Sequence, residues 1–163
     1  MTMFERLALV GDRMFDRLRD RRAFAITDNT AINGGLDVLR RHKYAVVVTF
    51  RRNGDPVPSP VWFGVDDRGR AYLRTDARSG KVKRLSHDNR ILIAPSNIRG
   101  RPMGPGFRAT GRVLPKQEWP HAEDTLAGAY GLGRRIWERL LGGSTDGAAY
   151  IEIEPGRGTR PQP

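Results

Sequence analysis

Residues 44–75 read YAVVVTFRRNGDPVPSPVWFGVDDRGRAYLRT, and this stretch decides the fold. Residues 44–52 begin with a β-branched run of strand length, and the NGDP sequence at 53–56 is a strong hairpin signal. A second strand is predicted at 57–65 and, after another turn, a third at 71–75. Because tight turns join these strands, the stretch predicts antiparallel pairing and argues against a parallel, doubly wound fold.

The sequence on either side extends this pattern. We expect a short helix before the stretch and a mixture of strands and helices after it: a helix at 36–42, a helix beginning near 79, strands at 90–97, 107–114 and 148–155, and one or two helices within 116–141. Five strands in close succession, then a helix and a returning strand, predict a mainly β (α+β) fold. Its form would be an antiparallel β-barrel or closely curled sheet with flanking helices.

Three segments are predicted along the chain. Residues 1–24 hold an N-terminal amphipathic helix, which we expect to pack against the body in preference to lying on a membrane. After a linker at 25–35, which contains an Asn-Gly-Gly break, the β-barrel domain spans 36–154. Residues 155–163 form a C-terminal tail.

Composition limits the possible functions. The chain has 163 residues, no cysteine and no uninterrupted apolar run long enough to span a membrane, which fits a cytoplasmic protein. His42, His87 and His121 are far apart in sequence, so we expect no bound metal. The formal net charge of +11 indicates an anionic partner, such as a multiply charged small ligand, a nucleic acid or an anionic lipid; a generally basic, solvated surface is the alternative.

The second predicted strand contains two prolines with one residue between them. Pro58 and Pro60 both lack an N–H on the same side of the strand, so that side cannot pair fully with a neighbour. The strand is therefore predicted at a sheet edge. Ser59 and the carbonyl groups around it would then either face a ligand or protect the edge against aggregation.

The segment SGKVKRL, residues 79–85, is electrostatically unusual. Ser79 is a candidate helix N-cap and Gly80 permits close approach to the backbone, yet Lys81, Lys83 and Arg84 follow at the positive end of the helix. A bound phosphate that accepts hydrogen bonds from the helix N–H groups and the Lys81 ammonium would neutralise this charge. The alternative is a solvated basic helix face.

Other motifs point to no catalytic residue. The chain has no P-loop pattern, and the Gly-Leu-Gly at 131–133 follows a helix and is no dinucleotide fingerprint. No Ser/His/Asp or Cys/His set is evident, and the acidic pairs Asp66-Asp67 and Glu152/Glu154 are expected to be solvated. A phosphate site without catalytic residues is typical of proteins whose cofactor does the chemistry.

The order of these motifs resembles that of a known family. The stretch at 44–67, then AYLRTDARSGKVKRL, the strand RILIAPSN and the loop RGRPMGPG resemble the split β-barrel flavin and deazaflavin oxidoreductases, in the branch similar to pyridoxamine 5′-phosphate oxidase that uses coenzyme F420. The resemblance covers roughly residues 36–154. It implies a six-stranded, FMN-binding-like split barrel, and a homodimer with the cofactor in a groove at the subunit interface.

The resemblance also implies which residues contact the cofactor. Phosphate contacts would come from the end of the third strand and the following helix: Arg74, Thr75, Ser79, Gly80, Lys81 and Arg84. The cofactor ring would lie along the second strand and under the Gly/Pro-rich loop: Ser59, Pro60, Val61, Trp62, Arg101, Met103 and Gly104. Two departures from the family are Asp88-Asn89, where an Asn-Pro pair is common, and Phe107-Arg108-Ala109, where an acidic residue and a glycine are common.

The resulting prediction is a coenzyme F420-dependent oxidoreductase that transfers a hydride between the reduced deazaflavin and a small organic substrate. One alternative keeps the fold and binds FMN, either as an oxidase-like enzyme or as a non-catalytic cofactor-binding protein. Another is a basic nucleic-acid-binding module, which the scattered arginines and the lack of an aromatic-rich recognition motif disfavour.

Overall fold

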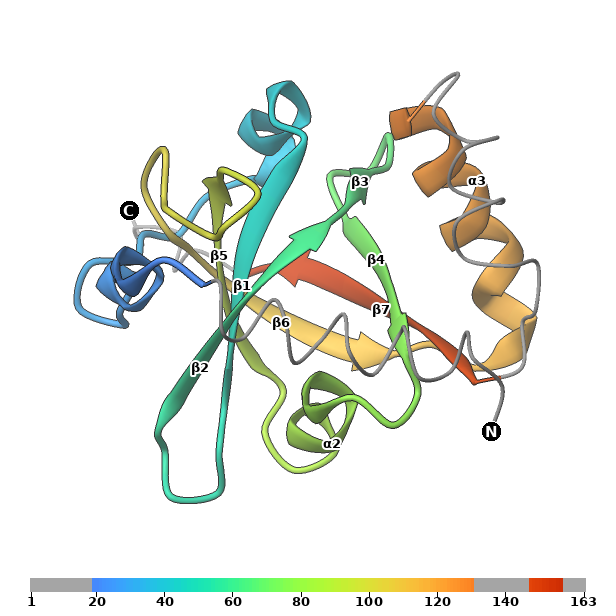
Figure 1. Cartoon of the computed structure of the whole chain (residues 1–163). Coiled ribbons are helices and arrows are strands. Elements are labelled where there is room, and N and C mark those ends of the chain that lie inside the picture. Colours follow the sequence, from blue (N-terminus) through green and yellow to red (C-terminus); the bar gives the residue numbers. More distant parts are fainter. Residues whose placement is uncertain (1–18, 131–146, 157–163) are drawn as a thin grey trace, which may run out of the picture.

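The structure is a computed structural model and describes residues 19–130 and 147–156. These residues contain two α-helices, α2 and α3, three 3₁₀ helices, η1 to η3, and the strands β1 to β7 (Figure 1). The bounds are η1 Arg21–Ala25, η2 Leu36–Arg41, β1 Tyr44–Phe50, β2 Pro56–Trp62, β3 Gly64–Val65, β4 Ala71–Asp76, α2 Gly80–Leu85, β5 Arg90–Ser96, β6 Phe107–Val113, η3 Lys116–Glu118, α3 Trp119–Tyr130 and β7 Ala148–Pro155.

The strands form one curled antiparallel sheet in the order β2-β1-β5-β6-β7-β4-β3. Its two outermost strands, β2 and β3, are separated in sequence only by Phe63. Two neighbouring strands of the chain can stand at opposite ends of such a sheet only if the sheet curls until its ends meet (Figure 1). The predicted mainly β, barrel-like fold is confirmed.

The number of strands differs from the prediction of six. The stretch 57–65, predicted as one strand, is two: β2 pairs with β1, whereas β3 pairs with β4. The change of partner falls at Phe63, which lies outside both strands and is 3% exposed in the barrel core. The hydrogen-bond ladder must break where the chain passes from one end of the sheet to the other, so the stretch counts as two strands. The described residues therefore contain seven strands.

The edge position of β2 is confirmed. Pro58 and Pro60 pair with Val48 and Val46 of β1, and β2 has no strand on its other side within the described residues. Arg19 Nη1 donates a hydrogen bond to the Pro58 carbonyl oxygen at 2.6 Å. The edge therefore receives its donor from a side chain where a neighbouring strand would otherwise supply an N–H.

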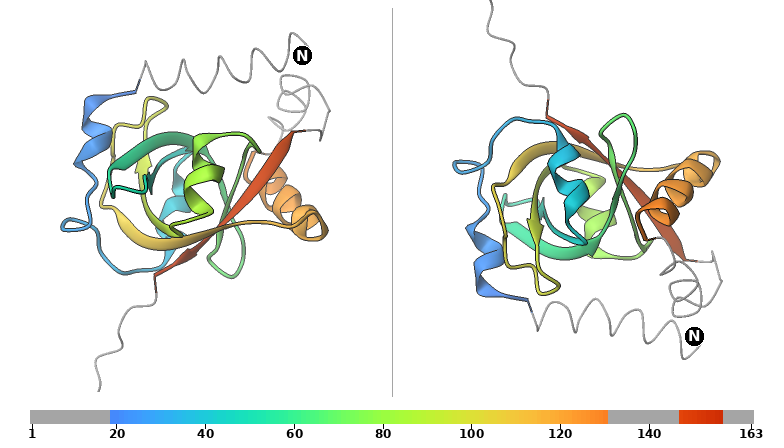
Figure 2. Two further views of the ribbon diagram at one scale, coloured as in Figure 1. Left: turned by 90° about the horizontal axis from the view of Figure 1, so that it is seen from below. Right: turned by 90° about the horizontal axis from the view of Figure 1, so that it is seen from above.

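Strand β1 is buried on both faces. Ala45 and Val47 belong to the barrel core, whereas Val46 and Val48 pack outside it, in a second apolar cluster. Residues 23–31 supply the cover for this outer face. In Figure 2 the segment around η1 runs along the outside of the sheet.

Helix α3 lies on the outer face of the opposite half of the sheet (Figure 1). Ala122 and Leu126 of α3 pack with Tyr72 and Tyr150 from β4 and β7. The helix approaches β3 closely at Gly64, where a Cβ would lie 2.9 Å from the backbone oxygen of Thr125.

Some predicted features lie outside the described residues. These are residues 1–18 of the N-terminal helix, residues 131–141 of the last helical region with its Gly-Leu-Gly break, and residues 157–163 of the tail. In the part of the chain that is described, no helix is long and apolar enough to cross a membrane. The cytoplasmic location stays a prediction.

Candidate functional site

Hydroxyl groups hold the start of α2. The Ser79 Oγ accepts a hydrogen bond from the Val82 backbone N–H at 3.5 Å, which confirms Ser79 as the N-cap. The Thr75 hydroxyl, near the end of β4, donates to the same Ser79 Oγ at 3.1 Å. Because Ser79 Oγ accepts both bonds, its own proton can be donated to a further partner.

Arg84 folds back along α2 toward Gly80. Its Nε donates to Thr49 Oγ1 of β1 at 2.7 Å. A Cβ on residue 80 would lie 2.5 Å from Arg84 Nη1, so a side chain there would displace the guanidinium. Gly80 therefore leaves room over its backbone, which the protein's own arginine occupies in this structure, while a phosphate contact at Gly80 stays a prediction. We call Thr49, Thr75, Ser79, Gly80 and Arg84 the cradle.

The basic side chains of α2 have different exposures. Lys81, next to the cradle in sequence, is only 8% exposed, whereas Lys83 is exposed. The first turn of this described helix carries no acidic residue. Hydroxyl, guanidinium and ammonium groups can all donate hydrogen bonds, and such a set suits a phosphate or another oxyanion.

The predicted residues of β2 divide between two faces of the sheet. Val61 packs against the barrel core, and Ser59, two residues earlier, points the same way and is 8% exposed. Pro60 and Trp62 lie on the outer face, where the Trp62 ring centroid is 6.2 Å from that of Tyr44.

The loop after β5 lies beside this outer face. The Met103 backbone N–H donates to the Pro95 oxygen at 2.7 Å, and Gly104 packs so closely on Pro95 that a Cβ would lie 2.9 Å from its Cγ. A Cβ at Gly100 would be 3.6 Å from Pro60. The Met103 side chain itself is 62% exposed.

Arg74 lies apart from the other predicted phosphate contacts. It precedes Thr75 on β4 and pairs with Tyr150 of β7, so it faces the opposite side of the sheet from Thr75. Burial and the hydrogen bond to Glu123 raise the pKa of Tyr150 to about 12, and the charge of Arg74 opposes this rise. Arg101 is exposed.

Some of the predicted residues thus form two groups at opposite ends of β1, whereas Arg74 and Arg101 belong to neither. The cradle meets β1 at Thr49, whereas Pro60 and Trp62, which we call the outer-face group, meet it near Tyr44, with the loop of Met103 next to them. Tyr44 and Thr49 are five residue steps apart, which is about 17 Å at the usual rise of a strand.

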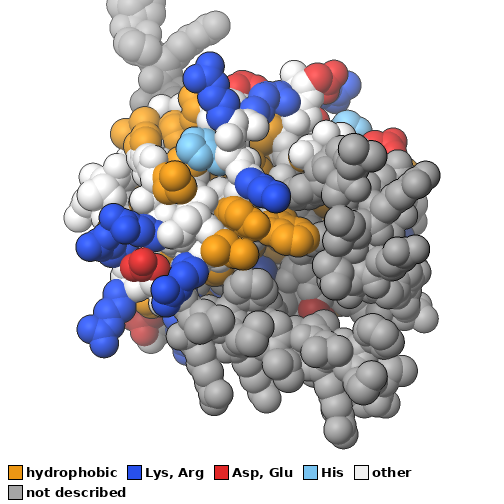
Figure 3. All heavy atoms as spheres, turned by 45° about the horizontal axis from the view of Figure 1, so that its top comes forward, with side chains coloured by type: hydrophobic (Ala, Val, Ile, Leu, Met, Phe, Trp, Pro, Cys, Tyr) orange, Lys and Arg blue, Asp and Glu red, His pale blue; other side chains and the backbone are white. Residues whose placement is uncertain are grey.

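The surface of one face shows how the positive charge is distributed. In Figure 3 the Lys and Arg side chains lie in separate groups around a central hydrophobic area, and acidic side chains lie next to several of these groups. Among the described residues, a continuous basic stripe, as expected for a surface that follows a nucleic-acid backbone, is not seen on this face.

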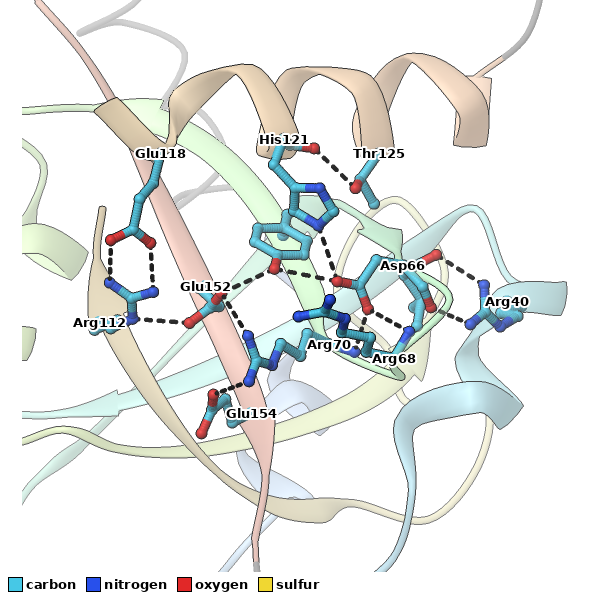
Figure 4. Close-up of polar contacts among 12 residues, drawn as sticks. Arg40, Asp66, Arg68, Arg70, Arg112, Glu118, His121, Thr125, Glu152 and Glu154 are labelled. Carbon is cyan, nitrogen blue, oxygen red and sulfur yellow. Dashed lines mark hydrogen bonds and ion pairs between the residues drawn. The ribbon is translucent and has the colours of Figure 1, made fainter. Parts of the chain in front are cut away.

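A second polar centre lies beneath α3, and the sequence did not predict it. The buried Tyr72 hydroxyl of β4 lies 2.8 Å from Glu152 Oε2 and 3.2 Å from Asp66 Oδ2 (Figure 4). It has one proton, which it donates best to the nearer Glu152. His121 Nε2 of α3 lies 3.0 Å from the same Asp66 oxygen. We call Asp66, Tyr72, His121 and Glu152 the carboxylate centre.

Two arginines pair with the acidic groups of the carboxylate centre and its surroundings. Arg112 Nε donates to Glu152 Oε1 at 2.8 Å, and the other end of its guanidinium bonds Glu118 (Figure 4). Arg70 lies between Glu152 and Glu154. Apart from Glu154, these groups line a cavity of about 450 Å³. Because these acidic and basic groups pair with one another, the arrangement joins β4, β6, β7 and α3.

The expectation that the acidic pairs are solvated is wrong for one member of each pair. Asp66 is 6% exposed and Glu152 is 3% exposed, whereas Asp67 and Glu154 are not buried. The reason is tertiary: Asp66 accepts the backbone N–H groups of Arg68 and Arg70 and contacts His121 of α3, whereas Glu152 is enclosed by side chains of β4 and β6. One signal in the sequence could have indicated that Glu152 is buried: strand alternation places it on the same face as the aromatic side chain of Tyr150.

The Asp66 carboxylate should make stability depend on acidity. Burial alone would raise the pKa of Asp66, but hydrogen bonds from His121 and from the backbone N–H groups of Arg70 and Arg68 hold this pKa below its usual value. The stabilisation is complete above the unfolded-state pKa, about 3.9, and is lost as the pH falls through the lower folded-state pKa. We expect the melting temperature to fall less between pH 6 and pH 3 in Asp66→Asn than in the wild type.

The matched control is Asp67→Asn, which removes the same charge from the exposed neighbour. It should retain the acid sensitivity of the wild type when both are followed by circular dichroism. Equal acid sensitivity in Asp66→Asn and the wild type would contradict the role of Asp66.

A comparison with known protein families finds one that this chain matches. Residues 36–131, more than half of the chain, match the family described as pyridoxamine 5′-phosphate oxidase. The matched range contains the cradle and the outer-face group. No curated protein matches the chain by sequence.

Several solved structures share the fold. A protein of unknown function from Agrobacterium tumefaciens has a TM-score of 0.58 at 16% identity, over 74% of this chain and 52% of that one, so the chain spans about half of its length. The heme storage protein HutZ from Vibrio cholerae has a TM-score of 0.57 at 14% identity, over 77% and 93%. An FAD-binding protein from Mesorhizobium loti has a TM-score of 0.54 at 11% identity, over 74% and 86%. At these identities the likeness is one of fold alone.

Proposed function

Because the chain belongs to the pyridoxamine 5′-phosphate oxidase family, we propose that it is an oxidoreductase that binds coenzyme F420. The cofactor, when bound, supplies a hydride to a small organic substrate or receives one from it. The observation that carries this proposal is the cradle, in which Ser79, held by Thr75, and Arg84 bring hydrogen-bond donors close to Gly80.

The cradle fits a phosphate in its chemistry. The Ser79 hydroxyl keeps a proton to donate, and the Arg84 guanidinium offers a planar set of N–H groups that matches the oxygens of a phosphate. Lys81 brings a third donor to the same helix turn.

The net charge favours the larger of two possible cofactors. Coenzyme F420 carries a phosphodiester and a tail of glutamates, whereas FMN carries only its phosphate. A net charge of +11 suits the longer anion. FMN is the second candidate, and the family match together with the FAD-binding neighbour of the same fold supports a flavin-type cofactor.

The outer-face group would hold the cofactor ring. Pro60 and Trp62 offer a flat apolar surface next to the loop that carries Met103. Phe24, Ile98 and Met103 are exposed and belong to neighbouring segments, since the Asp20 N–H bonds the Arg99 oxygen. We propose that a second copy of the chain covers this side, so that the cofactor lies at a homodimer interface and water is excluded from the reacting atoms.

The test is a fluorescence titration of the wild type and Lys81→Ala with F420 and FMN, with heme as a third ligand because the HutZ neighbour stores it. We expect micromolar or tighter binding of F420, one molecule per chain, roughly tenfold weaker in Lys81→Ala. Sedimentation of the complex should give the mass of a dimer.

The outcomes separate the candidates. Binding of FMN but not F420 would make the protein a flavin enzyme or a flavin carrier. If no cofactor bound and salt-sensitive binding to nucleic acid were found instead, the proposed function would be wrong.

A further inference from the structure

One residue of the cradle was not predicted from the sequence, and its contact has a definite geometry. Thr49 lies on the inner face of β1, in line with Ala45 and Val47 of the barrel core, and is 1% exposed. It follows three valines, from which a threonine differs in shape by little more than one oxygen atom. That oxygen accepts the hydrogen bond from Arg84 Nε at 2.7 Å.

This bond determines where the rest of the guanidinium lies. With Nε bound to Thr49, the Nη1 and Nη2 ends lie over Gly80, at 2.5 Å and 3.3 Å from the position of a Cβ there. Ser79 lies next to Gly80 in sequence and keeps a donatable proton. A long arginine side chain has many rotamers, so a fixed Nε lowers the entropy lost when the other nitrogens bind an anion.

We propose that Thr49 is a positioning residue that sets the preference for phosphate-bearing ligands over phosphate-free ones. The inference rests on the proposed function, because it assumes that the cradle holds the cofactor phosphate. Thr49 acts through Arg84 and needs no contact with the ligand itself.

The experiment measures the dissociation constants of FMN and riboflavin, which differ only in the phosphate, in the wild type, Thr49→Val and Thr49→Ser. Valine keeps the shape and removes the acceptor, whereas serine keeps the acceptor. Thr49→Val should bind FMN roughly three- to tenfold more weakly, the effect of one ordinary hydrogen bond, with riboflavin affinity unchanged. Thr49→Ser should retain the FMN preference of the wild type.

If the flavins do not bind, the same dissociation constants are measured in the same three proteins with F420 and its phosphate-free deazaflavin. Equal loss for both members of a pair in Thr49→Val would show a merely structural role and overturn the inference. Unchanged phosphate preference in Thr49→Val would overturn it as well, while the proposed function would stand. A wild type that binds none of the four ligands would overturn the proposed function and this inference together.

Discussion

Arg84→Ala is expected to weaken the binding of the phosphate-bearing cofactor by ten- to a hundredfold. The reason is that the guanidinium brings charged hydrogen-bond donors to the cradle, and one such bond is worth about 1.5–3 kcal/mol. The phosphate-free form should bind Arg84→Ala as it binds the wild type. Isothermal titration calorimetry with both forms measures the difference.

Lys83→Ala is the matched control for this prediction. Lys83 precedes Arg84 on the same helix, is exposed, and carries the same charge. If the position of the positive charge matters, Lys83→Ala should bind the cofactor with an affinity within about twofold of that of the wild type, since exposed charges interact weakly across water. An equal loss in the two variants would mean that the overall positive charge, and not the cradle, attracts the ligand.

Glu152→Gln should strongly destabilise the fold, although it changes the size of the side chain very little. Glu152 is 3% exposed and accepts from both Arg112 Nε and the Tyr72 hydroxyl. A glutamine amide must turn its NH₂ group toward one of these two donors, which then loses its acceptor. The substitution also removes the negative charge that faces Arg70. Because both arginines are partly exposed, we expect a loss of about 2–3 kcal/mol, below the cost of a fully buried broken pair.

Urea unfolding followed by fluorescence measures this loss, which corresponds to roughly 4–12 °C in melting temperature. Glu154→Gln is the control, because Glu154 lies on the same strand and face but its side chain is 46% exposed. Its pair with Arg70 should be worth less than about 1 kcal/mol. If the two variants unfolded at the same urea concentration, the carboxylate centre would not contribute to stability as proposed.

The strands and turns were predictable because their signals are local. The hairpin at 53–56 is closed by the Arg51 N–H bond to the Asp55 oxygen, with Gly54 at a φ of +88° that favours glycine. Ser79 caps α2 through its own side chain. In each case the residues that decide the structure lie within a few positions of one another.

The strand break at Phe63 was not predictable in the same way. The stretch 57–65 has the composition of one strand, and only the curling of the whole sheet separates the partner of β2 from the partner of β3. Thr49 shows the intermediate case. Strand alternation places it on the inner face, but its partner Arg84 is 35 positions away and could not be inferred from spacing.

By itself, the sequence determined the antiparallel class, the edge position of β2 and the residues at the start of α2, because prolines, turn residues and capping residues act through their own backbone neighbours. Only the tertiary structure decided that Asp66 is buried while Asp67 is exposed, and that Glu152 but not Glu154 belongs to the carboxylate centre. Neighbouring acidic residues have the same intrinsic chemistry. Which of them becomes buried depends on partners from distant parts of the chain, His121 of α3 for Asp66 and Arg112 of β6 for Glu152.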